Sequence, residues 1–164
     1  MEFKVFIVLV AFVGSSYCYS DGAPSSECSS MTPRHHVDPQ KSSFPYNIIL
    51  SKNKIRAGDT IEITVQGKTA DDTFKGLLVQ ARVGDTAVGS FDVSPSSQYI
   101  QLNDCGNSKG NAVTHKKITN GIRTVKMLWK APANLSEKVV VYATVARNGG
   151  TFWVNQKSDV ISVN

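Results

Sequence analysis

The stretch TIEITVQ, residues 60–66, alternates apolar and polar side chains without a break. In an extended chain, Ile61, Ile63 and Val65 share one face, and the other face carries hydroxyl, carboxylate and amide groups. This period of two residues predicts a β-strand with one buried face. Further along, KVVVYATVAR at 138–147 is apolar on both faces, which is typical of a central strand.

The rest of the chain extends this pattern in both directions. Short strand-like runs occupy residues 77–83, 88–93, 99–102, 112–116, 123–130, 151–154 and 160–163. Gly, Asn and Asp separate them, and we find no stretch with a helical period of 3.6 residues. Eight or nine short strands predict an all-β, two-sheet sandwich over residues 46–164. Residues 21–45 are rich in Pro, Ser, Gly and His, and we expect them to form an irregular arm over this domain.

The first twenty residues predict a secretory signal peptide. Residues 5–13 (VFIVLVAFV) contain no polar side chain, and small and polar residues follow up to Ser20. A membrane-spanning helix needs about 20 apolar residues, so a transmembrane anchor is disfavoured. We place cleavage after Ser20, with Cys18 as the alternative, and expect a secreted, extracellular protein.

The cysteines provide a second expectation. Removal of the signal peptide takes Cys18 away and leaves Cys28 and Cys105. Two cysteines in an oxidising compartment most simply form one disulfide, and neither has the CxxC spacing of a metal site. In the chain-entropy model this bond is worth about 4 to 5 kcal/mol.

Basic residues are concentrated in the second half of the chain, although the whole sequence has a net charge of only +5. Residues 105–158 contain nine lysines and arginines against a single acid, Glu137. This excess favours an anionic partner such as a sulfated glycan, a lipid phosphate or a bacterial envelope polymer. A merely solvated surface is the alternative, and nucleic acid is disfavoured because no aromatic residues are interleaved with the bases. The candidate anion-binding residues are Lys109, Lys116, Lys117, Arg123, Lys126 and Lys130.

No motif in the sequence indicates catalysis. GxSxG, HExxH and phosphate-binding loops do not occur, so we expect neither an enzyme nor a cofactor. His35, His36 and Asp38 are a weak metal-site candidate, because adjacent histidines in an arm are more often exposed. Asn134-Leu135-Ser136 is a sequon that predicts N-glycosylation at Asn134.

Several motifs together resemble the reeler domain, and FKGLLVQAR at 74–82 is the most specific of them. The resemblance covers nearly all of the chain after the predicted signal peptide. The chain is similar in particular to the free-standing reeler domains of secreted insect defence proteins, including the noduler-like proteins. The other motifs that carry the resemblance are Asp21-Gly22-Ala23-Pro24 with Cys28, Met31, Pro33 and His35, then Cys105, Val113-Thr114-His115, Trp129-Lys130-Ala131-Pro132, Ala143-Thr144-Val145 and Trp153.

The resemblance implies an immunoglobulin-like sandwich with Trp129 and Trp153 in its core and a Cys28–Cys105 disulfide. It also implies release into body fluid and a role in innate immunity, with binding of lipopolysaccharide, lipoteichoic acid or blood-cell surfaces during nodule formation. The alternative is an extracellular-matrix or adhesion module that binds sulfated glycosaminoglycans. No catalytic residues accompany this family. At Arg82, alternation along the strand suggests a pair with an acid on the sheet surface.

Overall fold

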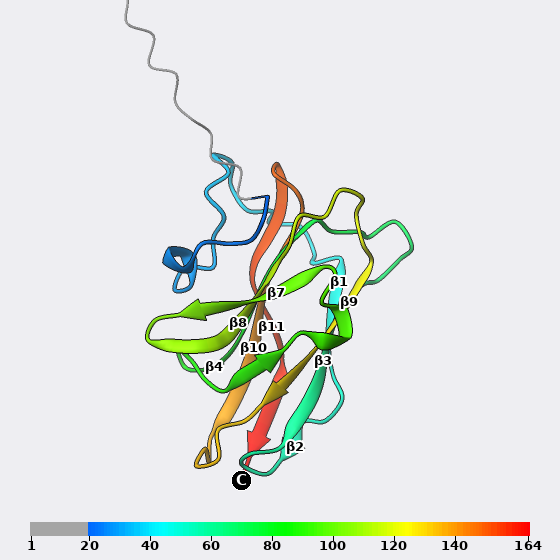
Figure 1. Ribbon diagram of the computed structural model, residues 1–164. Helices are drawn as coiled ribbons and strands as arrows, with labels where there is room; N and C mark the ends of the chain where they lie inside the picture. The colour runs from blue at the N-terminus through cyan, green and yellow to red at the C-terminus, as the bar shows by residue number, and fades with distance from the viewer. Residues whose placement is uncertain (1–19) are drawn as a thin grey trace, which may run out of the picture.

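Two β-sheets pack face to face in this computed structural model, which describes residues 20–164 (Figure 1). The predicted signal peptide, except for Ser20, lies outside the described residues. One sheet has four strands, in the order β1 (Tyr46–Leu50), β3 (Thr60–Gly67), β9 (Thr124–Lys130) and β6 (Ser90–Asp92). The other has seven: β2 (Lys54–Ile55), β11 (Thr151–Val163), β10 (Lys138–Asn148), β4 (Gly76–Val83), β8 (Ser108–His115) and β7 (Ile100–Cys105), with β5 (Thr86–Ala87) paired to β4.

The fold class expected from the sequence is confirmed: the domain is an all-β, immunoglobulin-like two-sheet sandwich. Its strand pairs are antiparallel with one exception. Strands β2 and β11 run parallel over two residues, Lys54 and Ile55 facing Ser162 and Val163. This short parallel pair extends the edge of the larger sheet.

The apolar face of β3 builds the core, as its alternation predicts. Ile61, Ile63 and Val65 are buried, and Ile63 lies opposite Met127 of the neighbouring strand β9. The predicted central strand, β10, pairs with β11 on one side and with β4 on the other. Trp129 and Trp153 are both buried, at 0% and 5% exposed. The core therefore lies between the two sheets.

The C-terminal strand differs from expectation. The sequence predicts separate strands at 151–154 and 160–163, whereas the structure has one strand, β11, over Thr151–Val163. The backbone keeps pairing with β10 through register shifts, and Asn155 adopts a positive φ of 54°. Alternation of apolar and polar residues shows only which side chains are buried. The middle of β11 carries polar, largely exposed side chains, so the sequence pattern does not reveal that its backbone stays paired there.

Residues 21–45 contain one short 3-10 helix, η1 (Ser25–Glu27), and no strand. They cross the outer face of the seven-stranded sheet. The structure joins Cys28 to Cys105 by a disulfide, with 5.6 Å between their Cα atoms. Met31, only 1% exposed, packs with these cysteines, Leu78 and Ala112 in a second apolar cluster outside the main core.

The side chain of Arg82 contributes to this attachment. We expected it on the sheet surface beside an acid, but it is 5% exposed and donates to the backbone carbonyl of Cys28. Gln80, two residues earlier on the same face, also donates to that carbonyl. The specific motif at 74–82 therefore supplies two of the side chains that hold the arm.

Candidate ligand-binding site

The six basic residues singled out from the sequence lie on both sheets. Lys109 is near the start of β8, whereas Lys116 and Lys117 follow its other end, about 23 Å away at 3.3 Å per residue. Arg123 directly precedes β9. Lys126 and Lys130 are exposed on β9, because alternation along the strand places them on the face opposite the buried Val125, Met127 and Trp129. The six residues therefore do not form one continuous patch.

Two of the six residues contact the end of a short 3-10 helix, η2 (Ser94–Ser96), and the residue that follows it. The ammonium of Lys116 donates to the carbonyl of Ser97 at 2.6 Å. The backbone N–H of Lys126 donates to the hydroxyl of Ser96 at 3.0 Å. The segment that ends β6 and leads to β7 thus contacts both residues, Lys116 through its ammonium and Lys126 through its backbone, while the ammonium of Lys126 pairs with Glu62.

Few of these cations are neutralised by carboxylates. Within residues 20–164 there are three ion pairs: Lys126 with Glu62, Arg34 with Glu27, and Arg147 with Asp72. Seven of the nine bases between residues 105 and 158 therefore have no carboxylate partner in the described chain. Arg123 instead donates from Nε to the carbonyl of Thr69.

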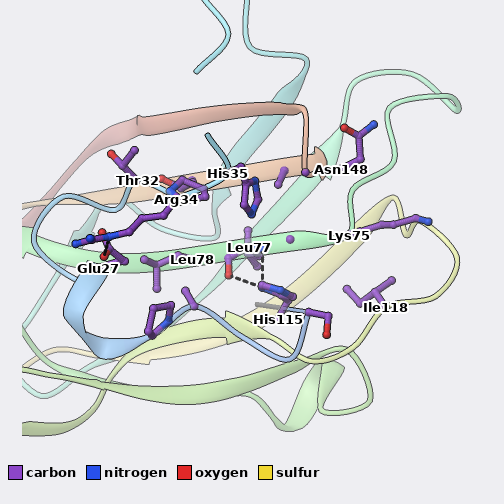
Figure 2. Close-up of a pocket in the computed structure, with 18 of the residues that line it drawn as sticks. Glu27, Thr32, Arg34, His35, Lys75, Leu77, Leu78, His115, Ile118 and Asn148 are labelled. Carbon is purple, nitrogen blue, oxygen red and sulfur yellow. Dashed lines mark hydrogen bonds and ion pairs between the residues drawn. The ribbon is translucent and has the colours of Figure 1, made fainter. Parts of the chain in front are cut away.

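A cavity lies beneath the arm, and none of the residues singled out from the sequence as a ligand site predicted it. This cavity has a volume of about 320 Å³ and lies between the arm and the outer face of the seven-stranded sheet (Figure 2). The arm, the first residues of β4, the last residues of β10 and the loop after β8 all contribute to its wall. Its apolar lining consists of Ala23, Pro24, Met31, Pro33, Leu77, Leu78, Ile118 and Ala146.

Charged groups lie at both ends of the cavity. At one end, Arg34 Nε is 2.6 Å from Glu27 Oε1, so these charges compensate each other. At the other end, Lys75 lies near Ile118 and extends outward (Figure 2). Lys117, next to Ile118 in the chain, also lines the cavity, and both lysines are exposed. This second end is therefore electropositive.

Two histidines lie on opposite sides of the cavity (Figure 2). His115 Nδ1 is 3.2 Å from both the backbone nitrogen and the carbonyl oxygen of Leu77. The ring of His35 packs edge-on against Phe152 at 5.3 Å, and its Nδ1 is buried without a hydrogen-bond partner among the described residues. Burial lowers the pKa of His35 from its ordinary value of 6.5, although the carbonyl of Gly149 favours the protonated ring.

The arm does not assemble a metal site in the part of the chain that the structure describes, where no group of three or more candidate metal ligands occurs. His36 is exposed at a φ of 57°, while the ring of His35 turns toward Phe152. Among residues 20–164, no helix is long and apolar enough to cross a membrane.

Asn134 is exposed in the loop between β9 and β10. That loop lies at the end of the sandwich opposite the cavity, because β10 begins beside it and reaches the cavity only at its far end, with Thr144, Ala146 and Asn148 (Figure 1). Glycosylation at Asn134, which stays a prediction, would leave the cavity accessible.

The model of one protein family, the Reeler domain, matches residues 26–164. This chain belongs to the Reeler domain family. "Putative defense protein 2" of Antheraea mylitta is 42% identical over 147 residues, which cover 88% of this chain and 91% of that one. "Putative defense protein Hdd11" of Hyphantria cunea is 41% identical over 88% of each chain.

The human F-spondin reeler domain has the same fold. The match to its crystal structure covers 85% of this chain and 99% of the F-spondin chain, with a TM-score of 0.63 and 14% sequence identity. The names of the two insect relatives support a defence-related role.

Sequence reasoning missed the apolar residues of the cavity, notably Leu78, Ala146 and Ile118. One signal was present. Leu77, Leu78 and Val79 follow one another in the family motif, so an apolar side chain lies on each face of the strand. An apolar residue on the outer face indicates that another segment covers it. The irregular arm shows no period that would identify it as that segment.

Proposed function

We propose that this reeler-domain protein acts outside the cell in defence by binding anionic polymers of the microbial envelope, such as lipoteichoic acid and lipopolysaccharide. The names of the curated relatives support a defence-related role. The choice of ligand rests on the charge of the second half of the chain.

The observation that carries this proposal is the excess of uncompensated cations. Seven of the nine bases between residues 105 and 158 have no carboxylate partner among the described residues. Exposed lysines such as Lys117 and Lys130 keep their charge available to a polymer with repeated phosphates. A polyanion can engage several separated cations at once, so one continuous patch is not required.

A salt-dependent titration tests the proposal. The full-length sequence is expressed in insect cells, and the protein purified from the medium is titrated with lipoteichoic acid and lipopolysaccharide at rising NaCl. We expect binding that weakens steeply with salt, because screening shortens the reach of exposed charges. Changing Lys116, Lys117 and Lys130 together to Glu should weaken binding at least tenfold.

The matched control reverses three exposed lysines outside the basic half: Lys41, Lys52 and Lys54. It changes the net charge by the same amount, and we expect it to affect binding much less. Absence of binding, or salt-insensitive binding that survives both triple changes, would overturn the proposal. Tighter binding to heparin than to either microbial polymer would instead support a matrix module that recognises sulfated glycosaminoglycans.

A further inference from the structure

We propose that the cavity beneath the N-terminal arm holds a single acyl chain whose anionic headgroup lies at the Lys75–Lys117 end. The assignment of this acyl chain to an envelope polymer rests on the proposed function, because acyl anchors are part of lipoteichoic acid and lipopolysaccharide. A free fatty acid has the same chemistry, and the experiment below separates the two sources.

The size and lining of the cavity suit an acyl chain. At about 30 Å³ for each water-sized group, 320 Å³ accommodates on the order of ten methylene groups. Ligand sites of a few hundred Å³ with a mostly apolar wall are typical of small-molecule binding. Leu78 and Met31, from the sheet and the arm respectively, provide such a wall and offer an acyl chain no charge to desolvate.

The charges at the two ends orient the ligand. Glu27 and Arg34 neutralise each other at one end, while exposed Lys75 and Lys117 leave the other end positive. A lysine can line an apolar site with its methylene groups and keep its ammonium in water. A carboxylate or phosphate at this end would therefore meet two ammonium groups while the chain extends inward.

The cavity is held open by fixed contacts on both of its sides. The backbone N–H of Ala23 donates to Thr114 Oγ1 at 2.7 Å, and the hydroxyl of Thr144 donates to the carbonyl of Met31 at 2.7 Å. Cys28 lies between Ala23 and Met31 in the sequence, and its disulfide to Cys105 fixes the arm at a third point. A preformed site requires little ordering of the protein when the ligand binds.

One polar atom at this site lacks a partner. His35 Nδ1 is buried without a hydrogen bond in the described chain, and His35 lines the cavity. This atom is enclosed by protein and exposes no surface to the cavity, so it takes no part in holding the ligand. The apolar wall and the positive end are the two features that indicate an amphiphile.

Fluorescence of cis-parinaric acid, a fatty acid whose emission rises in apolar sites, tests the inference on the full protein secreted from insect cells. Ala146→Phe should fill the cavity and raise the Kd for the probe at least tenfold. Ala133→Phe, in the exposed loop between β9 and β10, is the matched control and should leave it unchanged. Ile118→Glu places a charge at the half-buried mouth and should weaken binding even if Ala146→Phe misfolds.

Displacement of the probe distinguishes the sources of the chain. If the chain is a polymer anchor, intact lipoteichoic acid displaces cis-parinaric acid, whereas alkali-deacylated lipoteichoic acid does not and binds at least tenfold more weakly. If dodecanoate displaces the probe but intact lipoteichoic acid does not, the site takes free fatty acids and the proposed polymer function loses its link to the cavity.

Two results overturn the inference. The first is that the probe fails to bind, or binds the wild type and folded Ala146→Phe and Ile118→Glu variants equally well. The second is that intact and deacylated polymers bind with the same Kd, which would leave salt-dependent recognition of the polymer standing without a role for the cavity.

Discussion

The guanidinium of Arg82 donates a 2.6 Å hydrogen bond from Nη2 to the carbonyl oxygen of Cys28. Its Nε donates to Gln80 Oε1, also at 2.6 Å, and its carbon Cζ lies 5.1 Å from the centre of the Tyr142 ring. Burial lowers the pKa of Arg82, but an arginine stays charged in a protein. A carbonyl, an amide and an aromatic ring thus replace the water that this charge would otherwise need.

Arg82→Ala should lower the free energy of unfolding by about 2 to 4 kcal/mol, because it leaves the carbonyl of Cys28 and the amide oxygen of Gln80 without a charged donor. Urea denaturation monitored by tryptophan fluorescence measures the change. Lys157→Ala is the control: Lys157 lies 5.3 Å from the centre of the same Tyr142 ring but is exposed. Equal effects of the two changes on the free energy of unfolding would show that the contacts of Arg82 with the arm do not stabilise the protein.

The disulfide links positions 77 residues apart. Changing Cys28 and Cys105 together to Ser should lower the free energy of unfolding by about 4 to 5 kcal/mol, the entropy of closing such a loop in the unfolded chain. Guanidinium denaturation of the variant and of the oxidised and reduced wild type gives the three values to compare. A loss below about 1 kcal/mol would mean that the noncovalent contacts of the arm make the bond redundant.

Sequence alternation predicted the sandwich because burial between two sheets imposes a period of two on each covered strand. Residues 60–66 and 123–130 meet this condition, and their register in the structure places Ile63 opposite Met127. The same alternation explains why Lys126 and Lys130 are exposed, since they occupy the outward positions of β9. Local patterns thus predict which face of a strand is covered by the opposite sheet.

Contacts made by the arm were beyond such reasoning. Residues 21–45 have no period, so the sequence does not show which part of the sheet they cover. Arg82 was therefore placed at the surface, although the arm buries it. The cavity was missed for the same reason, because it exists only between the arm and Leu78, Ala146 and their neighbours. Tertiary contact between an irregular segment and a sheet face determines these features.

Gly89 lies against Trp129, and no other residue suits its position. Its φ is +76°, and a Cβ there would lie 2.5 Å from Trp129 Nε1 and still closer to the carbonyl oxygen of Lys130. Trp129 Nε1 donates at 2.9 Å to the carbonyl of the preceding residue, Val88, so the indole cannot move away without losing this bond. The backbone before β6 therefore packs directly on the core tryptophan.

Gly89→Ala should accordingly lower the free energy of unfolding by about 2 to 4 kcal/mol through strain and overpacking. Thermal unfolding followed by near-ultraviolet circular dichroism reports both stability and the environment of Trp129. Gly149→Ala is the control, since a Cβ there meets nothing within 4 Å. Similar melting temperatures for both variants would contradict the close packing at Gly89.

Acidification should loosen the arm through His35. Burial is the main reason that its pKa is lowered from 6.5, and the neighbouring His115 and His36 lower it further. As the pH falls through 6.5, the unfolded chain therefore takes up this proton before the folded protein does. Stability is then lost as the pH falls below this value, and the stabilisation from the neutral ring is fully present only above it.

We expect the melting temperature to fall between about pH 7.5 and pH 5.5, and to fall less in His35→Gln, which cannot take up the proton. His36→Gln is the matched control, because His36 is the exposed neighbour in the same arm. Hydrogen exchange of the backbone amides in residues 21–45 at both pH values locates the effect. If His35→Gln loses as much stability as the wild type on acidification, the half-buried imidazole of His35 does not couple the arm to pH.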